Sequence, residues 1–144
     1  MNILVLGASS IIGTSIVKSF AKNNKLFLLS RKRENLEMLR KEALELGSQS
    51  VIIVEGDLQT PIIVTDLISE SIDMIINVAC ASSRTKNYNI EHSRYQYYTA
   101  VDLSSPLIIL EHFLKEKLKK SENTQLYYIF INTFLTKIKS PDYS

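Results

Sequence analysis

The chain has 144 residues, the size of one domain, and its 45% hydrophobic and 22% charged residues exclude a disordered or fibrous protein. A net charge of +2 does not indicate a nucleic-acid partner, and the single cysteine, Cys80, cannot form an internal disulfide. The first apolar run ends at Gly7, too early for a signal peptide or a membrane span, so we expect a cytoplasmic protein with no membrane partner.

The first predicted strand and helix flank Gly7. Residues 3–6 are an apolar run of strand length. Residues 11–21 follow with helical spacing and stop at the pair Asn23-Asn24. The apolar face predicted for this helix consists of Ile12, Ile16, Val17 and Phe20.

A second strand, a second helix and a third strand are predicted next. Residues 26–29 and 51–54 are apolar runs, and the later one is rich in β-branched residues. Between them, residues 34–46 carry apolar side chains at spacings of three and four. Gly47 follows where the C-cap of this helix is expected.

The second half of the chain is predicted to continue the alternation. A helix is expected after Pro61, because proline suits the first helical turn, and residues 74–76 are a fourth strand. Residues 87–98 are polar and tyrosine-rich, typical of a loop that runs into a helix. The remaining elements are a long helix over 100–118, with Pro106 near its first turn or at a kink, and a fifth strand within 126–135.

Apolar strands separated by amphipathic helices predict a parallel sheet that is covered on both faces. Right-handed crossovers then give an α/β, doubly wound, Rossmann-type sheet of about five strands. We find no repeat and no linker, so residues 1–144 are interpreted as one domain.

The most informative segment is the turn between the first predicted strand and helix, residues 7–13. Glycines let the backbone turn sharply and approach a pyrophosphate closely, and the following helix offers free N–H groups to the anion. A P-loop would need a lysine before the Ser or Thr at the helix start. Here Gly13 is followed directly by Thr14, which excludes that motif.

This turn resembles the glycine motif of the short-chain dehydrogenase/reductase superfamily, TGxxxGxG, or TGxxGxxG in the extended branch that acts on nucleotide sugars. Gly7 and Gly13 match the first and last glycines, while the middle glycine is Ile11 in one alignment and Ser10 in the other. The resemblance implies an NAD(P)-binding Rossmann domain. The turn residues expected to contact the cofactor are Gly7, Ser9, Ser10, Ile11, Ile12 and Gly13.

The residues after the second strand, Ser30 and Arg31, bear on which cofactor binds. In the family an acidic residue here binds the ribose of NAD, whereas arginine accommodates the 2′-phosphate of NADP, which its planar fork suits. The resemblance therefore implies NADP, with NAD as the alternative. The other interpretation of Arg31, Lys32 and Arg33 is a solvated cluster at a helix start.

Two later landmarks carry the resemblance further. Asp57-Leu58, after the third strand, is similar to the family's Asp-Val or Asp-Leu pair beside the adenine ring, and Asp57 could equally cap the next helix. Asn77-Val78-Ala79-Cys80, after the fourth strand, resembles Asn-Asn-Ala-Gly, and it fits the extended branch about as well. Asn77 and Ala79 are the matching positions, and Cys80 is interpreted as a small packing residue.

The family's catalytic residues are represented only in part. Asp102 stands where an asparagine holds a proton-relay water, and Thr133 where the catalytic serine is expected, with a strand-end threonine as the alternative. The Tyr-x-x-x-Lys pair that moves the proton is expected just beyond Ser144, and no metal is expected. The resemblance therefore implies that the chain is truncated before the later strands and that these residues alone are inactive.

The function implied is an NAD(P)-dependent oxidoreductase whose intact form reduces a carbonyl or oxidises an alcohol of a small molecule. The alternatives are a non-catalytic dinucleotide sensor and an extended-type enzyme for nucleotide sugars. A receiver domain would need an acidic cluster, of which only Asp57 is present. The apolar fifth strand would lie at an open sheet edge, so we expect a homo-oligomer that associates through this strand or the long helix.

Overall fold

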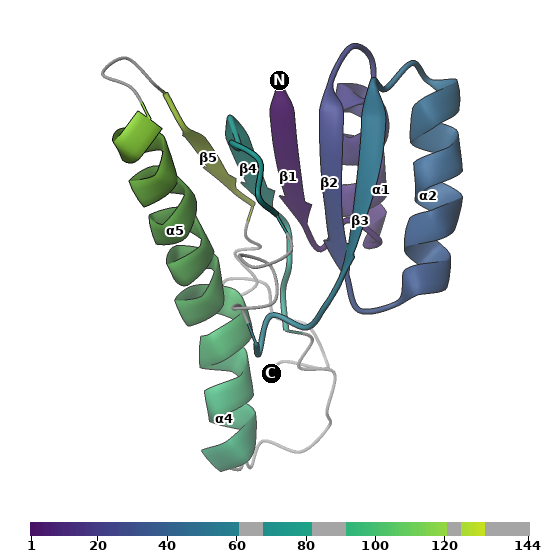
Figure 1. Cartoon of the computed structure of the whole chain (residues 1–144). Helices are drawn as coiled ribbons and strands as arrows, with labels where there is room; N and C mark the ends of the chain where they lie inside the picture. The colour runs from purple at the N-terminus through teal and green to yellow at the C-terminus, as the bar shows by residue number, and fades with distance from the viewer. Residues whose placement is uncertain (61–67, 82–91, 121–124, 132–144) are drawn as a thin grey trace.

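The computed structural model describes residues 1–60, 68–81, 92–120 and 125–131, which form one sheet flanked by helices (Figure 1). The predicted helix after Pro61 and the predicted Thr133 site lie outside the described residues. The strands are β1 (Asn2–Leu6), β2 (Lys25–Ser30), β3 (Ser50–Glu55), β4 (Met74–Asn77) and β5 (Tyr127–Phe130). The helices are α1 (Ile11–Phe20), α2 (Arg33–Glu45), α4 (His92–Thr99), a π-helical segment (Ala100–Ser104) and α5 (Ser105–Lys120).

The strands pair in the order β3-β2-β1-β4-β5, and every pair is parallel. The chain first moves outward from β1 to β3 and then returns to the other side of β1 with β4. This order is that of a doubly wound sheet, in which ligands bind at the carboxyl end of the strands where the order reverses. The predicted fold class is confirmed.

The strands β1 to β4 contribute alternate residues to two separate hydrophobic clusters. Leu4 and Leu6 belong to the cluster that also contains Ile109 and Phe113 of α5. Ile3 and Val5 belong to the opposite cluster, which packs against α1 and α2. Figure 1 shows α5 on one side of the sheet and the pair α1 and α2 on the other. Burial on both faces explains why the strands are continuous apolar runs.

The buried face of α1 agrees with the prediction except at Ile12, since Val17 is buried and Ile16 and Phe20 pack partly buried against the core. Gly13, Val17 and Ala21, at spacings of four, are buried, whereas Ile12 is 46% exposed. The reason is Gly13, which has no side chain and lets the helix approach the backbone of Ala8 directly. Gly13 therefore takes the place on the buried face that the prediction gave to Ile12.

The predicted end of α2 at Gly47 is confirmed in detail. Gly47 has φ +92°, a conformation that glycine adopts without strain. Its N–H donates to Leu44 O at 3.0 Å, and the N–H of Ser48 donates to Ala43 O at 3.1 Å. These two bonds form the Schellman motif, which satisfies carbonyls that the helix end leaves open.

The long helix begins earlier than predicted and contains a wide turn. α4, the π-helical segment and α5 follow one another without a break from His92 to Lys120. Within the segment the N–H of Ser105 donates to Ala100 O, five residues back. Pro106 follows directly, has no N–H and would clash with the carbonyl four residues before it in a regular helix. The widened turn is where the helix accommodates this proline.

β5 is shorter than predicted within the described residues and is paired only with β4 there. Tyr127, Ile129 and Phe130 of this strand are exposed. Among the described residues, no helix combines the length and apolar character needed to cross a bilayer.

Candidate dinucleotide site

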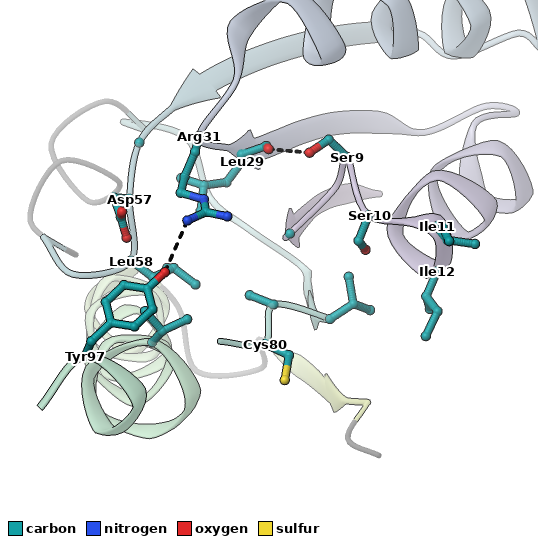
Figure 2. Close-up of a pocket in the computed structure, with 16 residues that line it drawn as sticks. Ser9, Ser10, Ile11, Ile12, Leu29, Arg31, Asp57, Leu58, Cys80 and Tyr97 are labelled. Carbon is teal, nitrogen blue, oxygen red and sulfur yellow. Dashed lines mark hydrogen bonds between the residues drawn. The ribbon is translucent and has the colours of Figure 1, made fainter. Parts of the chain in front are cut away.

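A cavity of about 570 Å³ lies at the carboxyl end of the sheet. Its walls come from the segments that follow β1, β2, β3 and β4 and from Tyr97 and Val101 on the long helix (Figure 2). The cavity lies where the strand order reverses, the position at which open α/β sheets bind ligands. Its volume is in the range of cavities that hold small molecules and cofactors.

The floor of the cavity is the turn between β1 and α1. The N–H groups of Gly7 and Ala8 both donate to Leu29 O, at 3.1 and 3.0 Å, which ties the end of β1 to the end of β2. The N–H of Ser10 donates to Gly7 O at 3.1 Å and closes a tight turn. Gly7 has φ +82°, the left-handed conformation that this turn requires.

The first turn of α1 leaves several main-chain donors open toward the cavity. Ser10 is the N-cap, and its hydroxyl oxygen accepts a hydrogen bond from Gly13 N–H at 3.0 Å. The N–H groups of Ser9, Ile11 and Ile12 have no acceptor among the described residues. Open N–H groups and the positive end of the helix dipole suit a phosphate.

The two glycines of this turn allow backbone segments to pack at very short range. A Cβ on Gly7 would lie 2.8 Å from Ala79 N, in the segment after β4. A Cβ on Gly13 would lie 2.4 Å from Gly7 O. A side chain at either position would push the turn away from its neighbours, which explains why both positions are glycine.

One end of the cavity is basic and aromatic. Arg31 follows β2, is exposed, and donates from Nη1 to the Tyr97 hydroxyl at 3.2 Å. The hydroxyls of Ser9 and Ser30 are hydrogen-bonded to each other. Asp57 lines the same end, and its Oδ1 accepts from the N–H of Gln59 at 3.0 Å. The helix that Asp57 was predicted to cap lies outside the described residues, and this bond within a turn decides neither of its two predicted roles.

Two buried or half-buried side chains shape the segment after β4. Asn77 is fully buried, and its Oδ1 accepts from Ala79 N–H at 3.1 Å. Asp102, in the π-helical segment, accepts from Ala81 N–H through Oδ1 at 2.7 Å. Asp102 therefore anchors this segment to the long helix, a contact that the predicted proton-relay role did not anticipate.

Cys80 is exposed and lines the cavity, so its interpretation as a small packing residue is wrong. Partial burial of the thiol and the negative charge of Asp102 raise the pKa of Cys80. A protonated thiol is a poor nucleophile, which agrees with the absence of a nucleophilic role in the sequence analysis.

The family model described as short chain dehydrogenase matches residues 1–130. This chain belongs to the short-chain dehydrogenase family. Two curated members from Arabidopsis thaliana, 11-beta-hydroxysteroid dehydrogenase-like 2 and 11-beta-hydroxysteroid dehydrogenase-like 3, are each 41% identical over 56 residues, which is 38% of this chain and 18% of theirs.

Solved structures of the family share the fold. A 3-oxoacyl-[acyl-carrier protein] reductase from Brucella melitensis with bound NAD superposes with a TM-score of 0.82 at 15% identity, covering 97% of this chain and 56% of that chain. A short-chain dehydrogenase from Sphingobium yanoikuyae in complex with NADPH gives 0.80 at 18% identity, covering 93% and 54%. This short-chain dehydrogenase sequence thus spans about half the length of the chains in these structures.

The structure brings most of the predicted cofactor residues together. The predicted residues that line the cavity are Gly7, Ser9, Ser10, Ile11, Ile12, Ser30, Arg31, Asp57, Leu58 and Ala79. Gly13 and Asn77 lie beneath the cavity and shape its backbone instead. Tyr97 was missed, because the tyrosine-rich stretch around it carried no motif and its helical start was not located.

Proposed function

We propose that this chain is the NADP-binding part of an oxidoreductase that reduces carbonyl groups or oxidises alcohols of small molecules. The observation that carries the proposal is the cavity of Figure 2, in which open main-chain N–H groups and Arg31 lie at one carboxyl edge of the sheet. Family members with NAD or NADPH in their structures support it. The proposed contacts of the diphosphate are Ser9, Ser10, Ile11 and Ile12.

The fit of a dinucleotide follows from the arrangement of donors. The diphosphate would lie against the first turn of α1, where N–H groups and the Ser9 and Ser10 hydroxyls are within one short segment. The adenosine end would extend toward Arg31, Asp57 and Leu58. When the cofactor is bound, its nicotinamide group supplies the hydride chemistry. The residues of this site bind and orient the cofactor through its diphosphate and adenosine.

Arg31 gives the first test of cofactor preference. Replacing Arg31 by alanine removes the cation nearest the proposed 2′-phosphate, so we expect NADPH to bind about tenfold to a hundredfold more weakly. NADH carries no such phosphate, and its affinity should change by less than about twofold. Isothermal titration calorimetry of both cofactors against the 144-residue protein measures the two effects.

The exposed Lys22, on the segment between α1 and β2, offers a matched control, since it does not line the cavity. Lys22→Ala removes one positive charge as well but should leave both affinities unchanged. If both variants bound NADPH equally weakly, the effect of Arg31 would come only from its contribution to the net charge of the protein. No binding of either cofactor by the unmodified chain at millimolar concentration would contradict the proposed function itself.

Turnover requires groups that this sequence does not contain. No Tyr-x-x-x-Lys pair occurs in its 144 residues, and Asp102 is already engaged with Ala81 N–H. We therefore propose that these residues bind cofactor without oxidising or reducing a substrate. Cofactor binding without turnover would also fit the alternative of a non-catalytic dinucleotide sensor, which the charged Asp102 at the family's asparagine position favours.

The exposed apolar surfaces predict self-association. Leu107, Leu114 and Leu118 of α5 are exposed and follow at spacings that place them on one helix face. Ile129 is exposed on β5, which pairs with β4 alone among the described residues. We propose that the chain forms a homo-oligomer through one of these surfaces. Sedimentation velocity should show a species larger than a monomer that grows with concentration.

Two single substitutions distinguish the surfaces. Leu114→Lys should dissociate an oligomer held by α5, and Ile129→Lys should dissociate one held by β5. A monomer at all concentrations for the unmodified chain would show that neither surface mediates association.

A further inference from the structure

One hydrogen bond crosses the basic end of the cavity. Arg31, at the end of β2, donates from Nη1 to the hydroxyl of Tyr97, on α4, at 3.2 Å. The two residues are 66 positions apart in the sequence and approach from different elements, as Figure 2 shows. Both side chains line the cavity, so the bond lies at the rim of the proposed adenosine end rather than on a remote surface.

Tyr97 is held in place by the core. Its ring is half-buried and packs against the hydrophobic cluster that contains Leu58 and Val101, which also line the cavity. The ring of Tyr98 lies 6.0 Å away, centroid to centroid, at a tilt of 59°. A ring fixed by such contacts has little freedom to lose, whereas the exposed Arg31 side chain has several rotatable bonds. The hydrogen bond to the fixed Tyr97 ring therefore restricts the conformations of the Arg31 side chain.

The hydrogen-bonding capacity of the pair is only partly used. A guanidinium has five N–H donors, and Arg31 spends one on Tyr97 and forms no ion pair with a carboxylate of the described residues. Neighbouring Arg33, in contrast, is engaged by Glu37 and Glu55. The Tyr97 oxygen accepts in this bond, so its own O–H proton is left to donate. The free N–H groups of Arg31 and the O–H of Tyr97 thus lie together at this end of the cavity, although the two residues belong to different elements.

We propose that Tyr97 is a specificity-determining residue for a 2′-phosphate on the adenosine. It holds the Arg31 guanidinium over the cavity before the ligand arrives and donates its O–H to the same phosphate. A hydroxyl in this position lowers the entropic cost of ordering Arg31 and adds a charge-assisted hydrogen bond. The inference rests on the proposed function, because it assigns the phosphate that the same site would bind.

The test uses two fragments that differ only in the phosphate at issue. Adenosine 2′,5′-bisphosphate and adenosine 5′-monophosphate are titrated by calorimetry into the 144-residue protein and into Tyr97→Phe, which keeps the ring and removes the hydroxyl. We expect the bisphosphate to bind the variant about five- to tenfold more weakly, and the monophosphate to bind both proteins equally. Tyr95→Phe, on the exposed side of the same helix, is the matched control and should change neither affinity.

A double-mutant cycle checks that Tyr97 acts with Arg31. In the Arg31→Ala background, Tyr97→Phe should weaken bisphosphate binding by less than it does alone, because the restrained partner is gone. Equal loss of both fragments in Tyr97→Phe, or unchanged bisphosphate binding, would overturn the inference while leaving the proposed function standing. Failure of the unmodified chain to bind either fragment or NADPH would instead sink the proposed function.

Discussion

Gly7→Ala is expected to destabilise the protein by about 3 kcal/mol and to abolish cofactor binding. Two costs add at this position. The backbone at Gly7 has φ +82°, which strains any residue with a Cβ, and the new methyl would lie 2.8 Å from Ala79 N and 2.9 Å from Ala79 Cα. Both neighbours are backbone atoms that no side-chain rotation can move. Chemical denaturation gives the free energy of unfolding, and calorimetry gives the affinity for NADPH.

Gly47→Ala is the matched control for this prediction. Gly47 has a similar backbone conformation, φ +92°, but a Cβ there would meet only the Lys22 Cγ at 3.8 Å. The control therefore isolates the cost of strain, about 1 to 2 kcal/mol, from the cost of close packing. It should also leave cofactor affinity unchanged, because Gly47 is at the far end of α2 from the cavity. Equal destabilisation of the two variants would show that the contact with Ala79 contributes nothing.

Asp73→Asn is expected to reduce the free energy of unfolding by about 2 to 3 kcal/mol, less than a fully buried ion pair would cost. Asp73 lies just before β4 and accepts from the N–H of Asn2 at 2.8 Å and from Lys117 Nζ at 2.7 Å. The Lys117 side chain is only 7% exposed, whereas the Asp73 side chain is 36% exposed. Replacing the carboxylate by an amide removes the negative charge that stabilises the buried ammonium of Lys117. The loss of unfolding free energy is reduced because water reaches the half-exposed side chain of Asp73.

The contribution of Asp73 should depend on pH with a defined sign. Partial burial acts to raise the pKa of this carboxyl, but the hydrogen bond from Asn2 and the Lys117 ammonium prevail and lower the pKa from its ordinary value of 3.8. The folded form therefore binds the proton less readily than the unfolded form. The stabilisation is present above the unfolded value and is lost as pH falls through the folded value.

Denaturation curves from neutral pH down to about pH 2 test this directly. The difference in unfolding free energy between the unmodified chain and Asp73→Asn should be constant near neutrality and shrink in acid. Glu42→Gln removes one partner of the exposed Lys18–Glu42 pair and serves as control, with an expected effect below about 1 kcal/mol. A difference that persists unchanged at acid pH would show that the loss comes from packing and not from charge.

Much of the fold could be predicted because burial imposes simple patterns. Strands covered on both faces become apolar runs, which located β1, β2, β3 and β4. The end of α2 was predicted because its Schellman motif needs a glycine. On α1 only the place of Ile12 was predicted wrongly, because spacing favoured its large side chain over Gly13. Because glycine has no side chain, the hydrophobic pattern did not indicate that Gly13 packs against the backbone of Ala8.

The candidate site was predictable where its residues lie in a local motif. The turn that follows β1 supplies several cavity residues in one short segment, and its glycines are visible in the sequence. Tyr97 is different, because its role depends on the packing of α4 against the sheet far along the chain. Asp102 shows the same limit. Its position matched a family landmark, but its bond to Ala81 N–H depends on how the π-helical segment faces β4.

The separation of the two hydrophobic clusters by the sheet has a consequence for unfolding. The turn that begins α1 belongs to one layer, and Tyr97 and Val101 rest on the other, yet all of them border the same cavity. A molecule seated there would contact side chains of both layers at once. Occupancy would thus merge two partly independent units into one cooperative unit, and amide protons in α1 and α5 would become slower to exchange together.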